Sequence, residues 1–111
     1  MDTKKDTILY VDDEILNLQL FTEYFNEEYH ILTCENPLLA DKLLAEHQVK
    51  VIISDQSMPE ESGIDFIQRI NTTYPDIIKI LFTAFSDHDL AIEAINKAGI
   101  YRYLLKPWNF V

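Results

Sequence analysis

The segment Val51-Ile52-Ile53-Ser54-Asp55 says most about the fold of this chain. Its three consecutive β-branched apolar residues are typical of a strand buried on both faces, because a half-exposed strand alternates apolar and polar residues. The segment Ile80-Leu81-Phe82 is likewise apolar at three consecutive positions. A sheet that is buried on both faces needs helices on both sides, which is the arrangement of α/β proteins with parallel strands.

Apolar runs of this kind recur along the whole chain and alternate with segments long enough for helices. The predicted strands are residues 8–11, 30–34, 49–54, 77–83 and 101–105. We therefore predict an α/β fold, a three-layer sandwich in which a five-stranded parallel sheet lies between helices. The chain ends soon after the fifth strand, so a fifth helix is expected to be absent from it.

Residues with capping chemistry mark the helix ends. Signals for the start of the second, third and fourth helices come from Asn36-Pro37, Ser62 with Asp65, and Ser86 with Asp89. The first helix is expected to begin near Glu14, and Gly99 is typical of the residue just past a helix end. Two i, i+4 rows of apolar residues run along the first helix, Leu16-Leu20-Tyr24 and Phe21-Phe25.

Composition limits the possible functions. The 111 residues, 48% of them hydrophobic, are enough for one compact domain, which we place at residues 7–111 behind a flexible tail at residues 1–6. The net charge of -10, from 9 basic and 19 acidic residues, argues against direct binding to nucleic acid or anionic membranes. The two glycines, Gly63 and Gly99, are too few for a dinucleotide-binding fingerprint and too far apart for a Walker loop.

Cysteine and histidine usage indicates neither a disulfide nor a transition-metal site. Cys34 is the only cysteine and is expected to be buried and inert. The three histidines lie in separate segments without ligand spacing and are assigned no site: His30, His47 and His88. Without a signal peptide or an apolar stretch long enough to span a bilayer, the expected location is the cytoplasm.

The residues that end the predicted strands carry complementary chemistry. They are Asp12 and Asp13, Asp55, Thr83 and Lys106. In an open parallel α/β sheet the carboxyl ends of the strands form the ligand crevice, so these side chains are expected to converge. Close carboxylates raise one another's pKa unless a cation neutralises them. Lys106 supplies one positive charge, and oxygen ligands without nearby His or Cys favour Mg²⁺ for the rest.

A phosphoryl group is the anion that such a site would suit, because a carboxylate nucleophile, a metal, an ammonium and a hydroxyl can all act on it. Each residue also has an ordinary structural role open to it. Asp12 and Asp13 could cap the first helix, and Thr83 and Ser86 could cap the fourth. Asp55 could be an ordinary loop carboxylate before Met58-Pro59, and Lys106 could be solvated beside Pro107. The conjunction of four strand ends favours the functional interpretation.

The sequence resembles the receiver domain of two-component response regulators over residues 7–110. The motifs that carry the resemblance are Ile8-Leu9-Tyr10-Val11-Asp12-Asp13-Glu14, Ser54-Asp55-Gln56-Ser57-Met58-Pro59 with Gly63, Phe82-Thr83-Ala84, and Leu104-Leu105-Lys106-Pro107. The resemblance implies a flavodoxin-like fold with strand order 2-1-3-4-5. It also implies a sensor histidine kinase or a phosphotransfer protein as partner, and an output domain or effector beyond residue 111.

The resemblance assigns roles to particular residues. Asp55 would accept the phosphoryl group, and the metal ligands would be Asp13 directly, Asp12 through water, Asp55, and the backbone carbonyl of Ser57. Lys106 would pair with the phosphoryl oxygens. Thr83 would move to bond the group, and Tyr103 would turn inward as the switch, unless it is simply a core aromatic. Phe85 is hypothesised to slow hydrolysis of the aspartyl phosphate.

Two other functions stay open at this point. A Mg²⁺-dependent phosphotransferase or phosphatase would use Asp55 as nucleophile on a small substrate, but the chain has little length for a lid. A phosphorylation-independent interaction domain would need none of the five key residues. We expect a signalling module that promotes only its own phosphorylation and dephosphorylation. Because a face without a covering helix would expose apolar surface, self-association as a homodimer is also expected.

Overall fold

The computed structural model describes residues 5–83 and 102–105, with the backbone alone described at 83 and 102–105. The strands are β1 (Thr7–Val11), β2 (His30–Cys34), β3 (Val51–Asp55), β4 (Ile78–Thr83) and β5 (Arg102–Leu105). They form one parallel sheet in the order β2-β1-β3-β4-β5. Both the parallel sheet and the strand order implied by the resemblance are confirmed.

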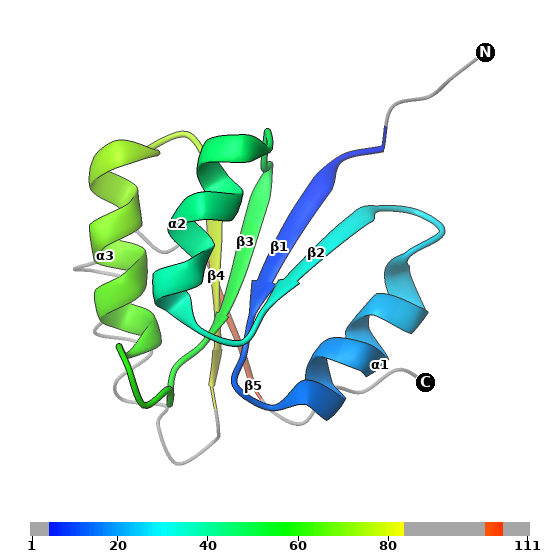
Figure 1. Ribbon diagram of the computed structural model, residues 1–111, viewed down its shortest axis with the longest axis horizontal. Helices are drawn as coiled ribbons and strands as arrows, with labels where there is room; N and C mark the ends of the chain where they lie inside the picture. Colours follow the sequence, from blue (N-terminus) through cyan, green and yellow to red (C-terminus); the bar gives the residue numbers. More distant parts are fainter. Residues whose placement is uncertain (1–4, 84–101, 106–111) are drawn as a thin grey trace.

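Three helices are described, and they cover the sheet from two sides. Helix α1 (Ile15–Phe25) lies against one face, while α2 (Pro37–Glu46) and α3 (Gly63–Thr73) lie against the other (Figure 1). The predicted fourth helix, with its Ser86, Asp89 and Gly99 signals, lies outside the described residues. In the described part of the chain no helix has the length and apolar character needed to cross a membrane.

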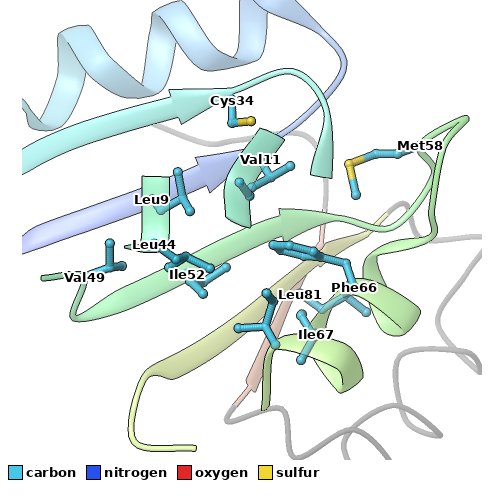
Figure 2. Close-up of a cluster of buried hydrophobic side chains, with 12 residues drawn as sticks. Leu9, Val11, Cys34, Leu44, Val49, Ile52, Met58, Phe66, Ile67 and Leu81 are labelled. Atoms are coloured by element: carbon cyan, nitrogen blue, oxygen red, sulfur yellow. The ribbon is translucent and has the colours of Figure 1, made fainter. Parts of the chain in front are cut away.

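The hydrophobic core has two parts, one on each face of the sheet. Alternate residues of β1 serve the two parts: Leu9 and Val11 face α2 and α3, whereas Ile8 and Tyr10 face α1. Figure 2 shows the larger part, where residues of four strands meet side chains of α2 and α3. Neighbouring residues of a strand point to opposite faces, and both Ile52 and Ile53 of β3 and both Leu81 and Phe82 of β4 are buried. The prediction that these two strands are buried on both faces is therefore confirmed.

Capping chemistry fixes where the helices begin. The side chain of Asn36 accepts a hydrogen bond of 2.8 Å from the backbone N–H of Leu38, and Pro37 follows as the first residue of α2. The hydroxyl of Ser62 accepts one of 3.2 Å from the backbone N–H of Asp65. Both predicted caps are confirmed. Glu14 is the N-cap residue of α1, as the sequence predicts to within one position.

Some predicted boundaries shift by one or two residues. Val49 was predicted in a strand but lies before β3, where its side chain is still buried in the core. Ile77 likewise precedes β4. In both places the parallel ladder fixes the start of the strand: the N–H groups of Lys50 and Ile78 donate to the carbonyls of Thr7 and Lys50. Apolar side chains can thus enter the core from just outside a strand.

Only one of the two apolar rows on α1 faces the sheet. Phe21 is buried, with 3% of its surface exposed, and packs against Tyr10. By contrast Leu16, Leu20 and Tyr24 are 64%, 41% and 48% exposed. The row Leu16-Leu20-Tyr24 therefore forms an apolar strip on the outer side of the helix.

The last two residues of the predicted tail, Lys5 and Asp6, already contact the domain. The Lys5 ammonium donates to the backbone carbonyl of Asn26 at 3.1 Å, and the carbonyl of Asp6 accepts from the N–H of His30 at 2.9 Å. The boundary between tail and domain stays a prediction.

Candidate functional site

Three carboxylates meet at the carboxyl ends of β1 and β3. Asp12 and Asp13 follow β1, and Asp55 is the last residue of β3. The two strands are neighbours in parallel register, with Val11 opposite Ser54, so Asp12 and Asp55 leave the sheet at the same level. One oxygen atom from each of the three residues lies within 4.8 Å of the others. Among the described residues this is the only such group of potential metal ligands.

The three carboxylates differ in how far they are exposed. Asp12 is completely buried and Asp55 is 2% exposed, whereas Asp13 is exposed. Two buried acidic side chains beside a third concentrate negative charge where water can do little to screen it. A small, hard cation with oxygen ligands is the partner that such an arrangement suits.

Hydrogen bonds fix the orientation of Asp12. Its Oδ2 accepts from the hydroxyl of Tyr10 at 2.7 Å and from the side-chain amide of Asn17 at 3.2 Å. Its Oδ1 accepts from the backbone N–H of Glu14 at 2.9 Å. Asp12 is therefore not the N-cap residue of α1, but it satisfies the backbone N–H of the N-cap residue, Glu14. This structural role does not exclude the predicted role at a metal, which stays a prediction.

The chain after Asp55 is tied to the start of α3 through Gln56. Its backbone N–H donates to the carbonyl of Phe82 at 3.2 Å, and its own carbonyl accepts from Gly63 at 2.9 Å. Its side-chain oxygen accepts from the N–H of Ile64, also at 2.9 Å. Gln56 therefore satisfies two N–H groups of the first turn of α3 while it anchors the turn to β4. No local pattern around Gln56 predicts this role.

Gly63 lets α3 pass close to the candidate phosphoacceptor. A Cβ atom at this position would collide with the backbone carbonyl oxygen of Asp55 and would lie 2.9 Å from Cδ1 of Leu81. Only a residue without a side chain fits between the two.

Arg69 holds the segment between β3 and α3 from the outside. Its guanidinium forms two hydrogen bonds with Glu61, at 2.9 and 3.0 Å, and two with Asp41 of α2, at 2.7 and 2.8 Å. It also lies over the ring of Phe66, 5.5 Å from the ring centre. These carboxylates raise the pKa of Arg69 above its ordinary range, with Glu61 contributing most. The loop that contains Ser57 is thereby tied to both helices on this face.

The other predicted site residues are described in part or not at all. Ser57 is exposed in the segment between β3 and α3. Thr83 is the last residue of β4, one position beyond the Phe82 that pairs with Asp55, and Tyr103 of β5 pairs with Leu81. Lys106 and Phe85 lie outside the described residues. The roles of all five stay predictions.

Cys34 is buried, as predicted, and its thiol donates to the carbonyl of Asn36 at 2.9 Å. Burial raises the pKa of this thiol, which disfavours the reactive thiolate.

The structure also brings His30 and His47 together, with their ring centres 6.5 Å apart, although they lie far apart in the sequence. They belong to no group of three potential ligands within the described part of the chain.

Comparisons with known proteins agree with this geometry. The family model of the response regulator receiver domain matches residues 8–111. The hydrogenase transcriptional regulatory protein HoxA of Bradyrhizobium diazoefficiens is 37% identical over 103 residues, which are 93% of this chain but 21% of that protein. This chain therefore spans about a fifth of the length of such a relative.

Solved structures of receiver domains have the same fold as this chain. The signal receiver domain of an HD domain-containing protein from Pseudomonas fluorescens has 33% identity and a TM-score of 0.89, with 96% of this chain and 86% of that one covered. The BeF3-activated receiver domain of DrrB has 27% identity and a TM-score of 0.82, with coverage of 96% and 89%. The chain belongs to the response regulator receiver domain family, the phosphorelay modules of two-component signal transduction.

Proposed function

We propose that Asp55 is the phosphoacceptor of this domain. A carboxylate oxygen of Asp55 attacks the phosphorus of a phosphohistidine on a sensor kinase or phosphotransfer protein. The P–O bond forms as the P–N bond breaks, and the imidazole leaves with its electron pair and takes up a proton. The product is an aspartyl phosphate, a mixed anhydride that water later hydrolyses.

The observation that carries this proposal is the meeting of Asp55 with Asp12 and Asp13 at one edge of the sheet. Asp55 is the member that ends a central strand, and its backbone is held by Gln56 and by the close approach of Gly63. A nucleophile held in this way loses little freedom when it reacts. Asp12, by comparison, precedes α1 and accepts three hydrogen bonds that fix the direction of its carboxylate.

Mg²⁺ is the metal that fits the donor set, because the site offers carboxylate oxygens and no nitrogen or sulfur ligand among the described residues. Asp13 and Asp55 would hold the ion directly, Asp12 largely through water, and the carbonyl of Ser57 would complete the protein ligands. When bound, the ion would neutralise the carboxylates and the phosphoryl oxygens that approach them.

The response to phosphorylation is proposed to pass through β4 and β5. Lys106 would pair with the phosphoryl oxygens, Thr83 would turn its hydroxyl toward them, and Tyr103 would move inward in response. Phosphorylation adds charge and hydrogen-bond acceptors at one edge of the sheet, and this biases the packing of a distant surface. The output is then a change of protein-binding surface, and Phe85 would set how long it lasts.

The wider setting is proposed on the same basis. The module promotes only its own phosphorylation and dephosphorylation, in the cytoplasm, and passes the signal to an output segment or effector beyond residue 111. The acidic surface favours protein partners over nucleic acid for this domain. Self-association as a homodimer stays a prediction, for which light scattering over a range of concentrations is the measurement.

The test is the intact mass of the protein after incubation with a small phosphodonor and Mg²⁺. We expect a gain of one phosphoryl group in the unaltered chain and none in Asp55→Asn or in the presence of a chelator. Asn keeps the size of the side chain but lacks the anionic nucleophile. The comparison of the unaltered chain with Asp55→Asn therefore isolates the contribution of the carboxylate.

Three results would count against the proposed function. A phosphoryl group that persists in Asp55→Asn would move the acceptor to another residue. The absence of any gain in a folded sample that binds Mg²⁺ would favour a phosphorylation-independent interaction domain. Steady turnover of the donor without accumulation of a phosphorylated chain, lost in Asp55→Asn, would favour a phosphatase or phosphotransferase.

A further inference from the structure

Tyr10 is a buried polar side chain for which the proposed chemistry has no role. It lies on β1 two residues before Asp12, and none of its surface is exposed. Its ring faces α1 and belongs to the smaller part of the core, where phenylalanine would fill the same space. Its hydroxyl, however, donates to Oδ2 of Asp12 at 2.7 Å in a buried hydrogen bond.

The ring of Tyr10 is held from two sides. Phe21 of α1 contacts it edge to face, with ring centres 5.0 Å apart and planes at 63°. Phe82 of β4 lies on another side, at 6.2 Å and 60°. A ring packed between a helix and a neighbouring strand cannot turn away without disturbing the core. The hydroxyl therefore presents its proton to Asp12 from a fixed direction.

Three donors together determine which way the Asp12 carboxylate faces. Tyr10 and Asn17 both bond Oδ2, and the N–H of Glu14 bonds Oδ1. Oδ2 is therefore drawn toward the interior. Of the three donors, the Tyr10 hydroxyl makes the shortest bond and is the one most deeply buried in the domain.

We infer that Tyr10 is a positioning residue for the cation site: its buried hydroxyl sets the orientation of Asp12 beside Asp13 and Asp55. The inference rests on the proposed function, since it concerns the same site. Partners that orient a carboxylate near a metal commonly affect metal affinity by an order of magnitude or more.

The variant Tyr10→Phe isolates the hydroxyl, because it keeps the ring and its contacts with Phe21 and Phe82. The measurement is calorimetric titration of the full chain with Mg²⁺ alone, without a phosphodonor. We expect Tyr10→Phe to bind Mg²⁺ about tenfold more weakly. Tyr29→Phe is the matched control. Tyr29 is exposed and directly precedes β2, so it lies at the amino-terminal ends of the strands, away from the carboxylates. Its affinity should equal that of the unaltered chain.

A second measurement separates positioning from general stability. Thermal unfolding is followed with a chelator and with saturating Mg²⁺, and the stabilisation by Mg²⁺ is the difference between the two. A purely structural role would lower both transitions by the same amount, whereas a positioning role reduces the difference. Asn17→Ala removes the other side-chain donor to Oδ2 and is expected to weaken Mg²⁺ binding in the same direction.

The possible outcomes are distinct. If the unaltered chain binds no Mg²⁺, the proposed cation site fails and the inference with it. If the unaltered chain binds Mg²⁺ and Tyr10→Phe binds it equally or more tightly, the site stands and the inference is overturned. A tenfold loss confined to Tyr10→Phe, with Tyr29→Phe unaffected, supports it.

Discussion

Replacing Gly63 with alanine should destabilise the domain and disturb the phosphoacceptor together. The new Cβ would collide with the carbonyl oxygen of Asp55 and lie 2.9 Å from Leu81. Overpacking of this kind costs about 1–3 kcal/mol. For Gly63→Ala we expect an overpacking cost of about 3 kcal/mol, at the upper end of this range. The reason is that the atom in the way belongs to the backbone and cannot move aside like the end of a flexible side chain. Alanine restricts the unfolded chain and offsets about 0.4–1 kcal/mol of that cost. The net loss is therefore about 2 kcal/mol.

The assay is urea denaturation, and phosphorylation is then measured under conditions where the variant is fully folded. With a slope of about 1–3 kcal/mol per M, a loss of about 2 kcal/mol lowers the midpoint by roughly 1 M. Gly63→Ser should lose about the same amount, because the collision involves the Cβ that both side chains share. The predicted collision is refuted if the free energy of unfolding of Gly63→Ala lies within about 0.5 kcal/mol of that of the unaltered chain. It is also refuted if Gly63→Ala and Gly63→Ser differ widely in this free energy. Phosphorylation of the folded variant should be slower, because the carbonyl that must move belongs to Asp55.

Two further predictions concern polar groups with defined partners. Gln56→Ala removes the acceptor for the N–H of Ile64 and should cost about 1 kcal/mol in urea denaturation, whereas Gln56→Glu keeps an acceptor and should lose less; equal losses would show that the bond is not responsible. Lys79 is 1% exposed and donates to Asn71 and Tyr74, both at 2.6 Å, and burial lowers its pKa below the ordinary value of 10.5. Since the unfolded chain then holds more protons than the folded one as pH approaches 10.5, the free energy of unfolding should rise with pH in that window. The rise should be smaller in Lys79→Met, and parallel curves for the two proteins would contradict this account.

Local patterns were enough to predict the elements of the fold. The apolar runs of β3 and β4 identify buried strands, and Asn36-Pro37 and Ser62 identify helix starts, because each signal acts within a few residues. The order of the strands is a different matter, since nothing local says which strand lies beside which. That order came from the resemblance, and the structure confirms it.

The limits of sequence reasoning are visible on α1 and in the histidines. The rows Leu16-Leu20-Tyr24 and Phe21-Phe25 look alike in sequence, but the angle at which α1 meets the sheet decides that Phe21 is buried and Leu16 is not. His30 and His47 meet only because β2 and the end of α2 lie side by side in the folded chain. Such pairings depend on tertiary geometry, which a single sequence does not specify.

The same distinction applies within the candidate site. Asp12, Asp13 and Asp55 could be grouped from sequence because strand ends in a parallel sheet share an edge, a rule that needs only the positions of the strands. Tyr10 and Gln56 follow no such rule. Tyr10 occupies a position where any large apolar side chain would satisfy the core, and Gln56 stands in a turn where most polar residues would be accommodated. Both act through one oxygen atom whose partner is known only once the fold is known. The acidic residues thus determine what chemistry is possible at this edge, while Tyr10 and Gln56 fix the directions in which Asp12 and the chain after Asp55 face.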